Sequence, residues 1–142
     1  MVKSISNEIV IVKRCNLMIL RIDHLVLTVR SLEYTCEFYA RILNFVRRDT
    51  PGKPTALHFG CCKINVHQVD LLFEPNARIP TPGSSDFCLI TDEDMSDFLK
   101  HLATEGIPVE TGPVVRIGAE GSMTSVYFRD PDQNLIEVSK YI

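Results

Sequence analysis

Two histidines and two carboxylates stand inside short apolar runs of the chain that are typical of β-strands. They are His24 in "DHLVLTV", His67 in "KINVHQV", Asp86 in "DFCLIT" and Glu137 in "LIEVSKY". Side chains alternate between the two faces of a strand, so each of these residues lies opposite the aliphatic side chains of its own run. Imidazole and carboxylate groups bind Zn²⁺, Ni²⁺, Mn²⁺ and Fe²⁺, and two of each would make a neutral site with positions open to a substrate.

Taken singly, each of the four residues is ordinary. A lone strand histidine usually makes a hydrogen bond in the core or at the surface, and a strand carboxylate usually faces water. Their places favour a shared role, because they fall on the first and last strands of two units that repeat along the chain. His24, His67, Asp86 and Glu137 are therefore candidate metal ligands.

The first unit, residues 20–75, has the order of one strand, one helix and three strands. A strand is expected over 20–29, and a helix over 32–43 with Ser31 as its N-cap and Asn44 as a left-handed stop. The three strands that follow are expected at 45–49, 55–60 and 63–69.

A stretch rich in proline, residues 74–85, leads to a second unit, residues 84–142. The same order returns, and at one constant offset His24 matches Asp86 while the helix stop Asn44 matches Gly106. The expected elements are a strand at 86–91, a helix at 92–105 and strands at 107–113, 122–130 and 135–141. The pattern predicts an α+β domain built from two βαβββ units.

Composition limits the classes of partner. The chain has 142 residues, 45% of them hydrophobic, which is enough for one domain with a buried core. The formal net charge is −3 and the basic residues are scattered along the chain, which argues against a nucleic-acid-binding surface. The expected partner is a small molecule.

The cysteines and the first residues indicate where the protein works. Five cysteines without a CxxC spacing, and without a secretory signal before them, favour a reducing cytoplasm. The apolar run at 8–12 is too short to span a bilayer, so no membrane association is expected. Residues 1–19 are interpreted as an N-terminal extension in which Met18 is an alternative start, and residues 20–142 as the single domain.

Two motifs carry a resemblance to a known family. "IDHLVLTV" opens the first unit and "VYFRDPDQNLIEV" closes the second, and together with the repeat they resemble the vicinal oxygen chelate superfamily. This superfamily includes glyoxalase I, extradiol dioxygenases, fosfomycin-resistance thiol transferases and bleomycin-resistance proteins. "KINVHQV", "FEP" and "PGSSDFCLIT" look most like the glyoxalase domain-containing protein 5 group and bacterial glyoxalase-type virulence proteins. The likeness covers about residues 20 to 142.

The resemblance implies a fold, a cofactor and an assembly. Its two βαβββ units form an incomplete barrel around one divalent metal, which chelates two neighbouring oxygens of a substrate. By position, the ligands would be His24, His67, Asp86 and Glu137. Relatives are commonly homodimers in which the two halves of a site come from different chains, and here His24 and His67 of one chain would meet Asp86 and Glu137 of the other.

The chain departs from glyoxalase I at two of these positions. Glyoxalase I typically has a glutamate on the fourth strand and a histidine on the fifth, where this chain has His67 and Asp86. A set of His24, His67 and Glu137 would also satisfy the two-histidine, one-carboxylate pattern of iron oxygenases, with Asp86 outside the direct ligands.

The function expected from the resemblance is a metal-dependent glyoxalase-like lyase or isomerase that acts on a small carbonyl compound or its thiol adduct. Glu137 would be the catalytic group that moves the proton. An extradiol dioxygenase or thiol transferase on the same metal site is an alternative, and a metal-free protein that binds a small molecule such as an antibiotic is another.

Residues for holding the substrate are less evident from the sequence. No obvious cluster of basic residues is present, although Arg47, Arg48, Arg116 and Lys140 are candidates by position. Cys88 shares the inward face of its strand with Asp86 and is a further candidate, with plain packing as the alternative.

Overall fold

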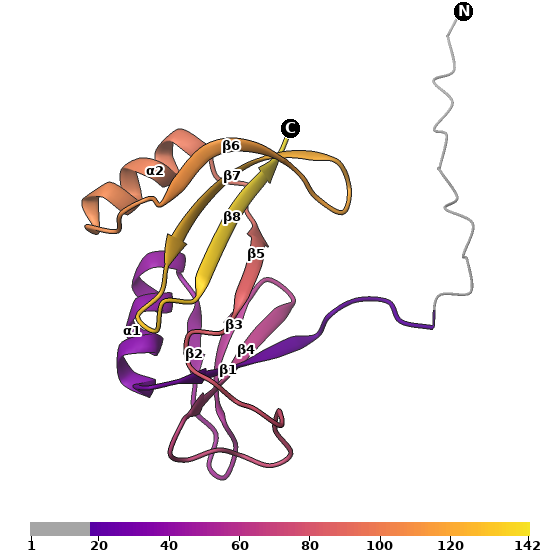
Figure 1. The fold of residues 1–142 in the computed structure, drawn as a ribbon, viewed down its shortest axis with the longest axis vertical. Helices are drawn as coiled ribbons and strands as arrows, with labels where there is room; N and C mark the ends of the chain where they lie inside the picture. The colour runs from indigo at the N-terminus through magenta and orange to yellow at the C-terminus, as the bar shows by residue number, and fades with distance from the viewer. Residues whose placement is uncertain (1–17) are drawn as a thin grey trace, which may run out of the picture.

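The computed structural model describes residues 18–142, which form two similar halves joined by one connection (Figure 1). The first half consists of β1 (His24–Val29), α1 (Leu32–Leu43), β2 (Val46–Arg48), β3 (Thr55–Phe59) and β4 (Cys62–Gln68). The second half consists of β5 (Asp86–Ile90), α2 (Met95–Thr104), β6 (Thr111–Ile117), β7 (Ser122–Arg129) and β8 (Leu135–Tyr141). The two βαβββ units predicted from the sequence are confirmed.

Local sequence sets the ends of α1 as expected. The Ser31 hydroxyl accepts the backbone N–H of Tyr34 at 3.4 Å, which satisfies one of the free donors of the first turn. Asn44 ends the helix with φ of 56°, in the left-handed region that asparagine tolerates.

Two boundaries in the second half differ from the sequence prediction. Helix α2 begins at Met95 and not at residue 92, because the Asp94 carboxylate accepts the N–H groups of Ser96 and Asp97 and so acts as the N-cap. The predicted strand at 107–113 is displaced to β6, Thr111–Ile117. A β-bulge between Thr111 and Val114 breaks the pairing with β7 at its start.

Each half contains one mixed four-stranded sheet. The strand order is β1-β4-β3-β2 in the first sheet and β5-β8-β7-β6 in the second, so the first and last strands of each unit pair in parallel. Both helices lie on the same side of the two sheets, to the left in Figure 1. One face of each sheet is therefore covered by the helices, and the opposite face, called the open face below, is not.

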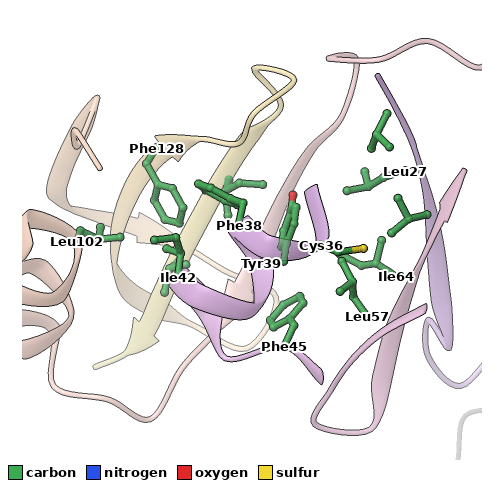
Figure 2. Packing of buried hydrophobic residues seen from close by; sticks show 14 of the residues in the cluster. Leu27, Cys36, Phe38, Tyr39, Ile42, Phe45, Leu57, Ile64, Leu102 and Phe128 are labelled. Carbon is green, nitrogen blue, oxygen red and sulfur yellow. The ribbon is translucent and has the colours of Figure 1, made fainter. Parts of the chain in front are cut away.

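The helix-covered faces build a single hydrophobic core (Figure 2). Leu27 of β1, Ile64 of β4 and Ile136 of β8 are 0% exposed, and burial of each such side chain contributes about 1.5–3 kcal/mol. Phe38 of α1 contacts Phe128 of β7 with ring centroids 6.5 Å apart, so α1 packs on both halves. Neither helix of the described region is long and apolar enough to cross a membrane.

Buried polar bonds add to the junction between the halves. The Tyr39 hydroxyl of α1 donates to Asp130 Oδ2 at 2.9 Å in the β7–β8 turn. Asp130 also accepts the backbone N–H groups of Asp132 and Asn134, both at 2.9 Å, and the side-chain amide of Asn134 at 2.8 Å. Arg30, which follows β1, donates to Asp132 Oδ1 at 3.0 Å. The "DPDQN" turn therefore holds the end of β7 against the first half.

Candidate functional site

His24 presents a free ring nitrogen on the open face of the first sheet. Its side chain is 44% exposed, and Nδ1 lies 2.9 Å from Asp23 Oδ1. An ionised carboxylate can only accept, so the Nδ1–H of His24 is the donor, and this bond holds the pKa of Asp23 below its usual value. In the neutral imidazole, Nε2 is then the acceptor nitrogen. Metal-binding histidines are commonly oriented by a carboxylate in this way.

His67 lies on the same open face but is covered. The residue is only 3% exposed because the segment after β4 folds over it, with the ring of Phe73 centred 5.5 Å from the imidazole. Burial lowers the pKa of His67, and its Nδ1 has no hydrogen-bond partner. A buried nitrogen without a partner is costly in a folded protein, which makes Nδ1 a candidate for a ligand interaction.

The strand register keeps these two histidines apart. In the parallel β1–β4 pair, His24 is opposite Lys63 and His67 is opposite Thr28. His24 and Thr28 are four residues apart on β1, which corresponds to about 13 Å along the strand. The residue diagonal to His24 on β4 is Asn65, not His67. The structure therefore does not bring the two predicted histidine ligands together.

Glu137 belongs to a network of hydroxyl and thiol groups on the open face of the second sheet. The Ser139 hydroxyl donates to Glu137 Oε1 at 3.2 Å and has contacts of 2.7 Å with the Ser125 hydroxyl and 3.3 Å with Cys88 Sγ. Since Ser139 has one hydrogen, and Glu137 as a carboxylate takes it, Ser125 and Cys88 are the donors to Ser139. Burial raises the pKa of Cys88, so this thiol keeps its proton for the network.

Asp86 shares the open face with Glu137 but is not beside it. Cys88 is the direct partner of Glu137 in the β5–β8 pair, and Asp86 is opposite Leu135. Diagonal neighbours in a sheet are about 7–8 Å apart, a distance that one metal ion with two carboxylate ligands can span only if both side chains turn toward it.

The two arginines predicted for substrate binding lie in different environments. Arg116 of β6 donates from Nε to the Tyr127 hydroxyl at 3.1 Å, and its guanidinium lies 5.6 Å from the centre of that ring. Tyr127 is the direct partner of Glu137, so Arg116 stands near the open-face network. Arg47 instead forms ion pairs with Glu33 of α1 at 2.7 Å and with Asp49 at 2.8 Å. It therefore lies toward the helix-covered side.

The donor types suit a divalent metal, but one chain does not assemble them. Within residues 18–142, no three side chains of histidine, cysteine, aspartate or glutamate lie close enough together to hold a metal ion. His24 and Glu137 lie on the open faces of different sheets. The described residues of one chain therefore do not bring the predicted ligands together into a metal site.

Two cavities in the described part of the chain stand out, and the sequence indicated neither. One of about 460 Å³ lies on the helix side of the junction, lined by Phe45, Phe59 and Phe98, away from the predicted ligands. The other, of about 400 Å³, opens on the first sheet. It is lined by Arg48, Thr50, Lys53, Pro54, Ala56, His58, Lys63 and Asn65. Its basic residues are scattered in the sequence and come together only through strand pairing.

Comparison with known proteins identifies the family. The sequence model of the Glyoxalase/Bleomycin resistance protein/Dioxygenase superfamily matches residues 21–138. Virulence protein STM3117 of Salmonella typhimurium is 48% identical over 122 residues, which are 86% of this chain and 85% of that protein. Glyoxalase domain-containing protein RDO1 of Mycosarcoma maydis is 47% identical over 120 residues, 84% of this chain and 68% of that protein.

Solved structures agree with this relationship. The crystal structure of STM3117 superposes with a TM-score of 0.86 at 47% identity, covering 89% of this chain and 100% of that one. Lactoylglutathione lyase from Agrobacterium tumefaciens, at 22% identity and a TM-score of 0.65 over 84% of this chain and 92% of that one, shares the fold. The resemblance drawn from the opening and closing motifs is thereby confirmed, and the chain belongs to the glyoxalase/bleomycin resistance protein/dioxygenase superfamily.

Proposed function

We propose that the chain is a metal-dependent lyase or isomerase that acts on a small carbonyl compound or its thiol adduct. The observation that carries the proposal is the placement of Glu137. This carboxylate stands on an open sheet face, in contact with Ser139 and paired with Tyr127 and Cys88, where a substrate has access to it.

The side chains divide the work between binding and proton movement. Glu137 would accept the proton from the carbon next to the substrate carbonyl and return it to the neighbouring carbon, and the Ser139 hydroxyl would hold the carboxylate in one orientation. Arg116 and Tyr127 would hold a polar end of the substrate. A divalent metal, when bound, supplies Lewis-acid stabilisation of the substrate oxygens.

The proposed metal site is shared by two chains. His24 of one chain, with Nδ1 held by Asp23 and Nε2 free, would bind together with Asp86 and Glu137 of the second chain. His67 is covered by the segment that carries Phe73 and lies about 13 Å along the strands from His24, so it is outside this proposed set of ligands. Zn²⁺, Ni²⁺, Mn²⁺ and Fe²⁺ all accept this donor set. The complete protein would then be a homodimer with two sites at its interface.

Metal analysis of protein purified without chelators tests the proposal directly. The expected result is a stoichiometric transition metal, or its uptake when Ni²⁺, Zn²⁺, Mn²⁺ or Fe²⁺ is added. His24→Ala and Glu137→Gln should each reduce metal affinity by about 10- to 100-fold or more while the fold is retained. Protein that neither contains nor takes up any of the four metals would disprove metal dependence.

Mixed dimers test whether the site is shared. His24→Ala and Glu137→Gln proteins, unfolded and refolded together, form dimers in which one site carries both changes and the other carries neither. Metal binding with wild-type affinity should return in these dimers, whereas each parent should bind metal only with the reduced affinity. Light scattering should give about twice the chain mass of 16.1 kDa. Mixed dimers that form without recovery would place all ligands of a site in one chain.

A metal-free binding protein is the second candidate function. It is favoured by the observation that no three potential ligands lie together within residues 18–142. Such a protein would bind a small molecule equally well after chelation. Activity that appears only with metal would identify the protein as an enzyme. The substrate that reacts, a carbonyl–thiol adduct, a catechol or an epoxide, would distinguish a lyase or isomerase from the dioxygenase and thiol-transferase alternatives.

A further inference from the structure

The cavity of about 400 Å³ on the open face of the first sheet has a basic wall. Its floor is Ala56 of β3, whose small side chain leaves a hollow between larger neighbours. In the register, Arg48 lies directly beside Ala56 on β2, and Lys63 on β4 lies beside His58 on β3. Strand pairing thus places two permanent positive charges and an imidazole around one hollow, and the β2–β3 turn adds Lys53.

The cations of this cavity are free of carboxylate partners, unlike most others in the described region. Arg30, Arg41, Arg47, Lys100 and Arg129 each form an ion pair with an aspartate or glutamate. Within residues 18–142, Arg48, Lys53 and Lys63 form none. Asp23, which interacts electrostatically with Lys63, is already bonded to His24 and Arg21. Three uncompensated cations around a hollow attract an anion of more than one charge.

The donors of the cavity fit a tetrahedral dianion. A guanidinium offers two parallel N–H groups, the two ammonium groups act as mobile point charges, and the Thr50 hydroxyl and the Asn65 amide are neutral donors in the same lining. A single carboxylate would leave most of these donors unused. A phosphate group has enough oxygens to accept from all of them.

We propose that this cavity is a phosphate-binding subsite and that the natural ligand is a phosphate monoester of a small carbonyl or hydroxycarbonyl compound. Lys63 is the direct neighbour of His24 across the β1–β4 pair. Strands in a sheet are about 4.8 Å apart, so the cavity over β3 and His24 on β1 are separated by about 10 Å, the length of a phosphate with a short carbon chain. The proposal that the cavity binds phosphate does not depend on the proposed function. The placement of the carbonyl group at His24 rests on that function.

Titration of metal-stripped protein isolates the subsite from the metal site. Calorimetry with inorganic phosphate and glycerol 3-phosphate as probes should show binding that weakens with added salt, and glycerol alone should show none. Arg48→Gln/Lys63→Gln should weaken phosphate binding by about tenfold or more. Lys100→Gln, which removes a charge from an exposed ion pair on α2, should change it less than twofold.

The outcomes separate this inference from the proposed enzyme function. Metal affinity of Arg48→Gln/Lys63→Gln should equal that of the wild type if the subsite only holds the ester. No phosphate binding at millimolar concentration, or equal weakening by Lys100→Gln, would overturn the subsite even if metal binding is found. If the double variant does not fold, acetylation of wild-type Lys53 and Lys63 must be slowed by phosphate, and unprotected lysines would overturn the proposal.

Discussion

Burial of a single thiol gives the protein a measurable response to alkaline pH. Cys36 on α1 is 2% exposed, and burial raises the pKa of its thiol to about 11 from an ordinary value of 9.0. Between these values the unfolded chain loses the Cys36 proton while the folded chain keeps it. The contribution of the Cys36 thiol to the free energy of unfolding is therefore complete below pH 9. It is lost as the pH rises from 9 to 11.

Cys36 should therefore determine how steeply stability falls with pH in this range. The free energy of unfolding should fall by up to about 1.4 kcal/mol per pH unit between pH 9 and pH 11 because of Cys36. Urea unfolding at a series of pH values should show a shallower fall for Cys36→Ala than for the wild type. Cys61→Ala, at an exposed position, serves as the control, and its free energy of unfolding should fall between pH 9 and pH 11 as steeply as that of the wild type. An unchanged slope in Cys36→Ala would contradict the assignment.

The two faces of β8 predict losses of stability that differ in size for substitutions at adjacent residues. Ile136 is 0% exposed on the helix-covered face, so Ile136→Ala should lower the free energy of unfolding by about 2–5 kcal/mol through lost contacts and a cavity. Glu137 is half-buried on the open face, and Glu137→Gln should cost less than about 1 kcal/mol. Denaturant unfolding of both variants measures the pair. Equal losses would mean that β8 has no open face.

Elements were predictable from the sequence where local chemistry decides them. The cap Ser31 and the stop Asn44 act through their own backbone neighbours, so the ends of α1 were correct. The start of β6 was not, because Gly112 approaches the backbone of β7 closely and a bulge shifts the pairing. Such a shift depends on the partner strand and leaves no periodic signal in the sequence.

The same limit explains the mixed outcome for the candidate site. Alternation along a strand predicted which face His24, His67, Asp86 and Glu137 occupy, and it needs no knowledge of a partner strand. Alternation does not predict which residues of neighbouring strands lie opposite one another. The register puts Lys63 beside His24, separates the two histidines and gathers the basic cavity from three strands and a turn. The face that each candidate residue occupies was therefore predictable from the sequence, and the distances between the candidates were not.

For the whole molecule, the Tyr39–Asp130 hydrogen bond is the most informative contact between the halves. Asp130 is 2% exposed, and its carboxylate accepts hydrogen bonds from Tyr39, Asp132 and Asn134. Tyr39→Phe removes one of these while keeping the ring in the core, so the free energy of unfolding should fall by about 1–3 kcal/mol. Tyr141→Phe is the matched control. Its hydroxyl accepts an exposed backbone N–H from Glu120, and its loss should cost less.

A double-mutant cycle attributes the effect to the junction. If Tyr39 acts through Asp130, then Tyr39→Phe should cost much less in an Asp130→Asn background than in the wild type, a difference of about 0.5–3 kcal/mol. Thermal or urea unfolding of the four proteins measures it. Additive losses would show that Tyr39 contributes only by packing in α1.

The parallel pairing of first and last strands has a consequence for how the chain is made. β5 has only β8 as its neighbour in the second sheet, and β8 is synthesised after every other strand of residues 18–142. The first half has all its strands once Gln68 has emerged, and domains generally acquire structure in the order of synthesis. During translation, until β8 has been made, the backbone N–H and C=O groups of β5 are therefore unpaired and its apolar face is exposed. Such an unpaired strand edge can pair with other chains. A ribosome that pauses before residue 135 prolongs this exposure, and chaperone binding to nascent chains should peak in that interval.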